Sequence, residues 1–164
     1  MRSRRKRLRS RHLLIDTNLL LLFVVGSSEP SLIERHKRTC QFTVEDYELL
    51  RRVLSQFRSL VTTPNVLTEV SNLVDQSGAH DPQPLQEFLA AIVGKLEEQY
   101  VASRDGCGME EFRRLGLADS TIIRLAQDKG DLAVLTDDIH LYLALQRRGL
   151  ETVNFNHLRE MSWQ

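Results

Sequence analysis

Short apolar runs alternate along the chain with longer stretches in which apolar residues recur every three or four positions. The short runs are typical of strands buried in a parallel sheet, and the longer spacing is typical of helices. The runs predict strands at residues 12–16, 60–63, 132–136 and 152–155. The spacing predicts helices at residues 43–57, 64–74, 85–101, 109–115, 118–129 and 139–148, and the fully apolar run 19–25 predicts a core helix. Strands that alternate with helices indicate an α/β fold in which a largely parallel central sheet is flanked by helices.

Capping residues mark several of these boundaries. Asn18 is expected to cap the apolar helix, and Gly26 is expected to end it. Thr43 and Asp46 have the spacing of a capping box, and Thr63 precedes a proline at the first position of the next helix. No internal repeat and no long linker occurs, so residues 12–164 are expected to form a single domain.

Charge is distributed unevenly along the chain. The 164 residues include 22 Lys and Arg and 22 Asp and Glu, but residues 1–11 contain seven of the bases and no acid. The remainder carries a formal charge of −7. We interpret residues 1–11 as a basic N-terminal arm that precedes the domain and suits contacts with phosphate groups. The alternative is a solvated tail without a ligand.

Several protein classes lack their signals in this sequence. Cys40 and Cys107 form no C-x-x-C pair, and the five histidines show no metal-binding spacing. Glycine-rich phosphate loops of the nucleotide-binding kinds do not occur. The longest apolar run is far shorter than the roughly 20 residues that a membrane-spanning helix needs. A cytoplasmic protein with no membrane partner is therefore expected.

Acidic residues follow the predicted strands. Asp16 closes the first strand, and Asp137 and Asp138 follow the strand at 132–136. Glu69 lies in the helix after the second strand, and Asp119 lies in the first turn of the helix at 118–129. Because ligands of such sheets gather at the carboxyl ends of strands, we expect these side chains to share one site.

Several carboxylates in one partly buried place repel one another, so they must either be protonated or be held by cations. Mg²⁺ and Mn²⁺ prefer carboxylate and water oxygens and leave positions open for phosphate. This donor set therefore suits metal-assisted cleavage of phosphodiester bonds.

The same four stretches resemble, in order, the acidic motifs of the PIN-domain nucleases, a family that includes the VapC toxins. They are Asp16-Thr17-Asn18, Thr63-Pro64 followed by Glu69, Leu117-Ala118-Asp119-Ser120, and Thr136-Asp137-Asp138. The resemblance runs from about His12 to Leu158. It implies a three-layer α/β fold and a Mg²⁺- or Mn²⁺-dependent endoribonuclease, with RNA as its substrate.

Carried over residue by residue, the resemblance implies a catalytic set of Asp16, Glu69, Asp119 and Asp138. Asp137 is adjacent to the fourth position and is an alternative metal ligand. Asn18 and Thr136 would hold the ligands in place by hydrogen bonds. In the arm, the expected RNA contacts are Arg4, Arg5, Lys6, Arg7 and Arg9.

The chain also departs from compact members of the family, because segments 26–59 and 76–110 are longer. A toxin role with an antitoxin partner, and a homodimer, are therefore narrower expectations. Two alternatives stay open. One is a non-catalytic RNA-binding or scaffold protein. The other is a haloacid-dehalogenase-like phosphatase with Asp16 as its nucleophile, although Asn18 stands where that family has a second Asp.

Overall fold

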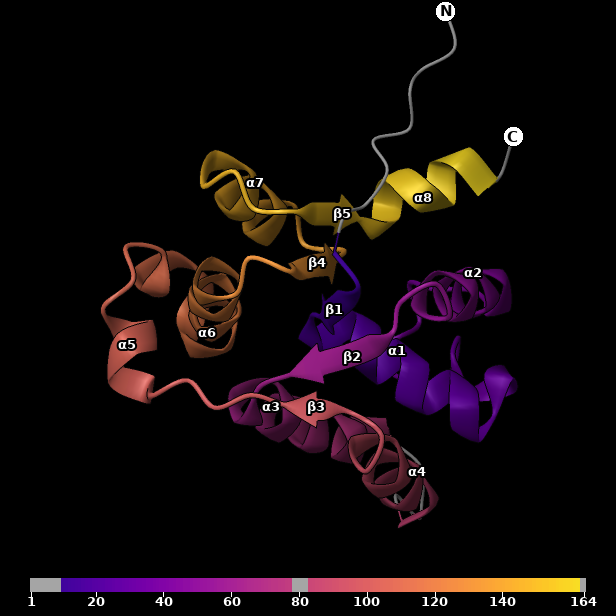
Figure 1. Cartoon of the computed structure of the whole chain (residues 1–164). Coiled ribbons are helices and arrows are strands. Elements are labelled where there is room, and N and C mark those ends of the chain that lie inside the picture. The colour runs from indigo at the N-terminus through magenta and orange to yellow at the C-terminus, as the bar shows by residue number, and fades with distance from the viewer. Residues whose placement is uncertain (1–9, 78–82, 163–164) are drawn as a thin grey trace, which may run out of the picture.

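The computed structural model describes residues 10–77 and 83–162 and contains a five-stranded sheet. Every pair of neighbouring strands is parallel, and the strand order is β3-β2-β1-β4-β5 (Figure 1). The strands are β1 His12–Ile15, β2 Ser59–Thr62, β3 Glu97–Glu98, β4 Leu132–Thr136 and β5 Thr152–Asn154. The expected α/β class with a parallel sheet is confirmed.

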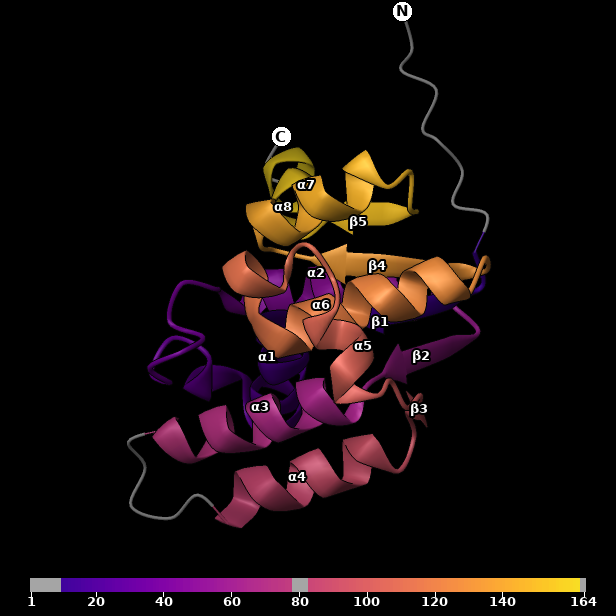
Figure 2. The same cartoon turned by 90° about the vertical axis from the view of Figure 1, so that its left-hand side faces the viewer.

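Helices cover both faces of this sheet. In Figure 1, α5, α6 and α7 lie on one side and α1 and α2 on the other, and Figure 2 shows α3 beside α4. The helices are α1 Thr17–Ser28, α2 Val44–Leu54, α3 Pro64–Val74, α4 Gln83–Val93, α5 Ser103–Cys107, α6 Phe112–Asp128, α7 Ile139–Arg147 and α8 Phe155–Ser162. Short 3₁₀ turns follow α1 at Pro30–Leu32 and α3 at Asp75–Ser77. This arrangement is consistent with three layers.

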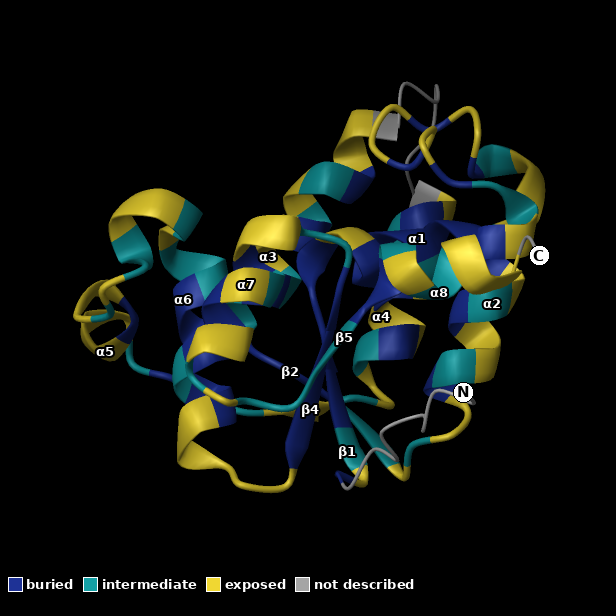
Figure 3. Cartoon of the chain, turned by 90° about the horizontal axis from the view of Figure 1, so that it is seen from above, coloured by how far each residue is buried: buried dark blue, intermediate teal, exposed yellow. Residues whose placement is uncertain are grey.

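The core lies around the two central strands. Every residue of β4 is buried, and so are three of the four residues of β1, as the dark blue strands in Figure 3 show. The apolar helix α1 packs beside them, with Leu19 to Leu22 all buried. Burial on all sides explains why these segments are continuous apolar runs rather than alternating patterns.

The start and end of α1 differ from the sequence-based expectation. Asp16 caps the helix through a hydrogen bond from the backbone N–H of Leu19, so the expected cap at Asn18 is wrong. Gly26 does not end the helix, which continues to Ser28. This glycine lies against the ring of Tyr47, where a methyl group would overlap the ring. Close packing, rather than helix termination, therefore requires glycine here.

Two further helix caps are confirmed, and the expected end of one helix is corrected. The Thr43 capping box and the Thr63 cap are both present. The helix expected at 85–101 ends at Val93, because the chain turns there and adds the two-residue edge strand β3. Gly116 adopts φ 83°, a value that favours glycine, and separates the start of α6 from the part that carries Asp119.

Most of the basic arm, including Arg4, Arg5, Lys6, Arg7 and Arg9, lies outside the described residues. Its last two residues contact the domain. The Ser10 side chain and backbone N–H donate to Glu151, and the Arg11 N–H donates to Asp131 at 3.1 Å. No helix in the described ranges is long and apolar enough to cross a membrane.

Candidate acidic site

The parallel pairing of β1 and β4 brings Asp16 and the turn after Thr136 together. Ile15 lies opposite Leu135, so the next residues of both strands leave the sheet side by side. At this point the strand order also reverses, because the chain continues from β1 to β2 on one side and β4 lies on the other. Ligand sites of parallel sheets occur at such positions, outside the carboxyl ends of the strands.

The carboxylate of Asp16 is buried and closely held. Its Oδ1 accepts a hydrogen bond from the Leu19 N–H at 2.9 Å. Its Oδ2 accepts from the Thr136 hydroxyl at 2.5 Å and from the Asp137 N–H at 3.0 Å. Asp16 therefore joins the end of β1, the start of α1 and the turn after β4.

Asp137 and Asp138 occupy different surroundings in that turn. Asp137 Oδ1 accepts from the Asn18 amide at 3.3 Å, and its backbone carbonyl accepts from the Asn156 amide at 2.9 Å. Asp138 Oδ1 caps α7 by accepting from the backbone N–H groups of His140 and Leu141. One carboxylate oxygen of Asp138 thus has a structural role. The other oxygen accepts no hydrogen bond from the described residues.

Glu69 and Asp119 enter from the two helices beside the turn. The Thr17 hydroxyl donates to Glu69 at 3.0 Å, which ties α3 to the first turn of α1. Asp119 lies in α6, which packs on α3 with Thr63 and Thr121 hydroxyls 3.3 Å apart. Within the described residues, the Asp119 carboxylate accepts no hydrogen bond.

The acids are close enough to change one another's protonation. Burial, followed by the charges of Asp138, Glu69 and Asp137, raises the pKa of Asp119 to about 7. Burial and the charge of Asp137 raise the pKa of Asp16 well above its usual range, against the opposing hydrogen bonds from Thr136 and Leu19. Burial also raises the pKa of Asp137. The five acids expected from the sequence therefore form one electrostatic cluster.

Among the residues that the structure describes, this cluster has no cationic side chain to balance it. In the described ranges, Asp16, Glu69, Asp119, Asp137 and Asp138 form no ion pair with Lys, Arg or His. Desolvated carboxylates without a countercharge are unfavourable, so a bound cation would relieve both burial and repulsion.

The donor set fits a hard divalent ion. In the part of the chain that the structure describes, no three Asp, Glu, His or Cys side chains already surround one point at metal-ligand distances. Mg²⁺, however, keeps several of its waters and commonly needs only one or two direct carboxylate ligands. Within the described residues, the Asp119 carboxylate accepts no hydrogen bond and Asp16 Oδ1 accepts one, so both acids have oxygens that suit direct ligation.

Two hollows in the described surface lie away from the acids. One, of about 310 Å³, is lined at the opposite ends of the strands by residues that include His12, Glu97 and Asp131. The other, of about 520 Å³, lies between α3 and α4. None of the five acids lines either hollow.

Comparisons with known proteins add no further evidence. No protein-family model matches the chain, and a search of curated proteins finds no match.

The sequence predicts that the five acids lie together, but it does not predict all of the residues that form hydrogen bonds with them. Thr136 contacts Asp16 as expected, and Asn18 contacts Asp137 although it is not the helix cap. Thr17 and Asn156 were not expected. Thr17 follows Asp16 directly and could have been found from that position, whereas nothing near Asn156 in the sequence relates it to the acids.

Proposed function

We propose that this protein is a metal-dependent endoribonuclease that hydrolyses RNA phosphodiester bonds. The observation that carries the proposal is the environment of Asp119. It is a largely buried carboxylate with a pKa raised to about 7, three acidic neighbours and, within the described residues, no hydrogen-bond donor. Such an arrangement is costly in a metal-free protein and useful when a divalent cation binds.

Asp16 and Asp119 would hold Mg²⁺ or Mn²⁺ directly, with Glu69, Asp137 and Asp138 around them. A divalent ion at this site supplies activation of water and neutralisation of charge on the phosphate. Thr136 and Asn18 orient Asp16 and Asp137, and Thr17 orients Glu69. In this arrangement, two residues share the role of the fourth acid. Asp137 lies beside Asp16, and Asp138 lies beside Asp119.

RNA is proposed as the substrate because the four acidic stretches resemble those of the PIN-domain nucleases. A toxin role with an antitoxin protein, a homodimer and a cytoplasmic location remain narrower parts of the proposal. Cys40 and Cys107 are exposed free thiols, which suits a reducing compartment.

The phosphatase alternative is disfavoured by the residue at position 18, because that chemistry uses a second acid beside the Asp16 nucleophile. Asn18, which stands where that family's second Asp would act, donates to Asp137 instead.

Cleavage of a mixed single-stranded RNA in EDTA, Mg²⁺ and Mn²⁺ tests the proposal. Asp119→Asn is the test variant, and Asp128→Asn is the matched control on the same helix, where Asp128 forms an exposed ion pair with Arg124. We expect cleavage that requires metal, falls about 100-fold or more in Asp119→Asn and is unchanged in Asp128→Asn. Binding of RNA without cleavage in any metal would favour the non-catalytic RNA-binding alternative.

A further inference from the structure

The C-terminal helix α8 contacts the turn that carries Asp137 and Asp138. Its residue Asn156 donates its side-chain amide to the backbone carbonyl of Asp137 at 2.9 Å. The N–H of the same peptide unit, that of Asp138, donates to the Thr136 hydroxyl at 2.9 Å. The peptide plane between the two acids is therefore held on both edges, and this plane sets the directions in which both carboxylates leave the backbone.

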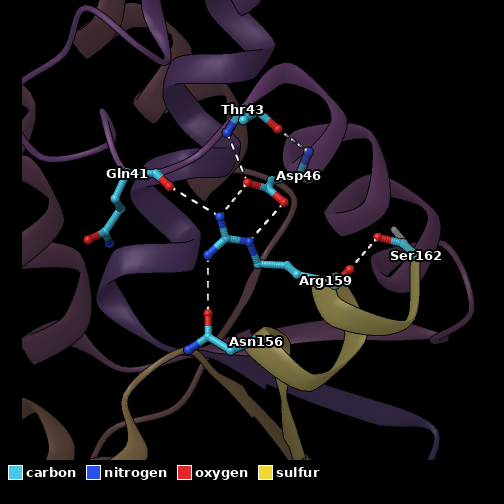
Figure 4. Close-up of polar contacts among 6 residues, drawn as sticks. All are labelled: Gln41, Thr43, Asp46, Asn156, Arg159 and Ser162. Atoms are coloured by element: carbon cyan, nitrogen blue, oxygen red, sulfur yellow. Dashed lines mark hydrogen bonds and ion pairs between the residues drawn. The ribbon is translucent and has the colours of Figure 1, made fainter. Parts of the chain in front are cut away.

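Asn156 is itself fixed in one orientation. Its backbone N–H donates to the Asn154 side chain at 2.9 Å, which sets the start of α8 directly after β5. Its side-chain Oδ1 accepts from Arg159 Nη1 at 3.2 Å (Figure 4). Rotating the amide by half a turn would place its NH₂ against the guanidinium and its oxygen against the Asp137 carbonyl, and both contacts would be repulsive.

Arg159 is in turn anchored to the N-terminal end of α2. It forms a two-pronged ion pair with Asp46, with Nε donating at 2.9 Å and Nη2 at 2.8 Å. Nη2 also donates to the Gln41 carbonyl, and the guanidinium lies 5.2 Å from the centre of the Phe42 ring. Asp46 is 1% exposed and completes the capping box with Thr43, so the anchor belongs to the rigid part of the fold.

We propose that Asn156 is a positioning residue for the acidic site, held by Arg159 and Asp46, and that it fixes the Asp137–Asp138 turn in the orientation that binds a divalent cation. The proposal rests on the function proposed above. Within the described residues, Asn156 forms no hydrogen bond with an acidic side chain and contacts the turn through the backbone carbonyl of Asp137. Residues that orient metal ligands in this way commonly change metal affinity by 10- to 100-fold when they are replaced.

Asn156→Ala removes the contact with the Asp137 carbonyl. Ser162→Ala is the matched control, because Ser162 lies at the end of the same helix and, in the described structure, its hydroxyl donates to the Arg159 carbonyl. Hydrogen exchange measured by NMR on the metal-free proteins reports on the turn through the Asp138 amide. The Val134 amide, which donates to Glu151 in the sheet, reports on the core. Calorimetric titration with MnCl₂ then gives the affinity for the ion.

We expect exchange of the Asp138 amide to be about 10-fold faster in Asn156→Ala, with the Val134 amide unchanged and the Mn²⁺ affinity about 10-fold weaker. Ser162→Ala should match the wild type in all three measurements. Unchanged exchange at Asp138 in Asn156→Ala, or faster exchange with unchanged Mn²⁺ affinity, would overturn the positioning role. A wild-type protein that binds no Mn²⁺ would instead overturn the proposed function, and faster exchange at Asp138 would then still support the contact between Asn156 and the turn.

Discussion

Two places in the described structure hold buried or partly buried carboxylates, and the charges of these carboxylates are balanced in different ways. Asp46 is 1% exposed and is matched by the guanidinium of Arg159, which contacts both of its oxygens. Asp16, Asp119 and Asp137 are gathered at the ends of β1 and β4 and in α6, and burial raises the pKa of each. The first place holds a complete ion pair between α2 and α8, whereas the acids at the second form no ion pair with a cationic side chain of the described residues.

The difference separates structural acids from candidate functional ones. A buried carboxylate that serves only the fold is given its countercharge by the chain, as Asp46 is. The cluster at the strand ends adds repulsion to burial, a cost that a bound cation would offset, although Asp16 and Asp138 also cap helices. Four predictions follow, ordered by the size of the expected effect.

Arg159→Met should cause the largest loss of stability, about 3 to 5 kcal/mol, because it leaves Asp46 buried without its partner. Urea denaturation measures the change. Replacing Asp46 by Ala in the same protein should recover part of the loss, since no charge then stays buried. A loss below about 1 kcal/mol in Arg159→Met would mean that the pair is as weak as an ordinary surface ion pair.

The stability of the metal-free protein should depend on pH through Asp119. Its pKa in the folded protein, about 7, lies above the ordinary value of 3.8, so the folded state binds more protons than the unfolded state between these values. The contribution of Asp119 to stability is therefore present below about pH 4 and is lost as pH rises to about 7, by up to about 1 kcal/mol per pH unit.

Comparison with Asp119→Asn isolates this contribution from that of other titrating groups such as His36. The stability of the variant relative to wild type should rise between pH 4 and pH 7 and level off above it. Saturating Mg²⁺ or Mn²⁺ should reduce the difference by stabilising wild type alone. A difference that does not vary with pH would show that Asp119 is ionised normally.

Asp16→Asn and Asp119→Asn should differ in stability although each replaces a carboxyl group by an amide. An amide NH₂ at the position of Asp16 Oδ2 cannot accept from Thr136 and Asp137, so Asp16→Asn should lose about 1 to 3 kcal/mol at pH 7. Asp119 has no such hydrogen bonds in the described structure, so Asp119→Asn should be at least as stable as wild type. Thermal unfolding of the two variants side by side provides the test, and equal stabilities would count against the contacts of Asp16.

The smallest effect is expected for Thr17→Val, which keeps the side-chain shape and removes the hydrogen bond to Glu69. Stability should fall by about 1 kcal/mol or less, because one hydrogen bond to a partly exposed carboxylate is lost. Mn²⁺ affinity should fall measurably in the same variant. An unchanged affinity in a calorimetric titration would remove Glu69 from the proposed site.

The acidic site was predictable because its signals are local. Asp16, Asp137 and Asp138 directly follow apolar runs, and Asp119 follows the glycine that breaks α6. Parallel pairing of β1 with β4 then brings the carboxyl ends of these strands together, so the local sequence is enough to predict that the acids lie close to one another. The class of fold was predictable for the same reason, since the central strands are buried on all sides and lack any alternation.

The supporting contacts were not predictable, because their partners lie far apart in sequence. Asp46 and Arg159 are 113 positions apart, and either residue alone resembles an ordinary helix-surface charge. The edge strand β3 consists of Glu97 and Glu98, both exposed, so its composition gives no strand signal. The sequence favours Asn18 as the helix cap because Asp16 closes the apolar run of the first strand, whereas in the structure Asp16 follows β1 directly and also caps α1.

The most direct test of the account is calorimetric titration of Mn²⁺ into wild type and Asp119→Asn at pH 6.5, in two buffers of different ionisation enthalpy. Asp119 is largely protonated at this pH in the metal-free protein, so binding should displace its proton and the apparent enthalpy should depend on the buffer. The account predicts this dependence in wild type and much weaker binding in Asp119→Asn. Absence of Mn²⁺ binding to wild type, or equal binding to both proteins, would contradict it.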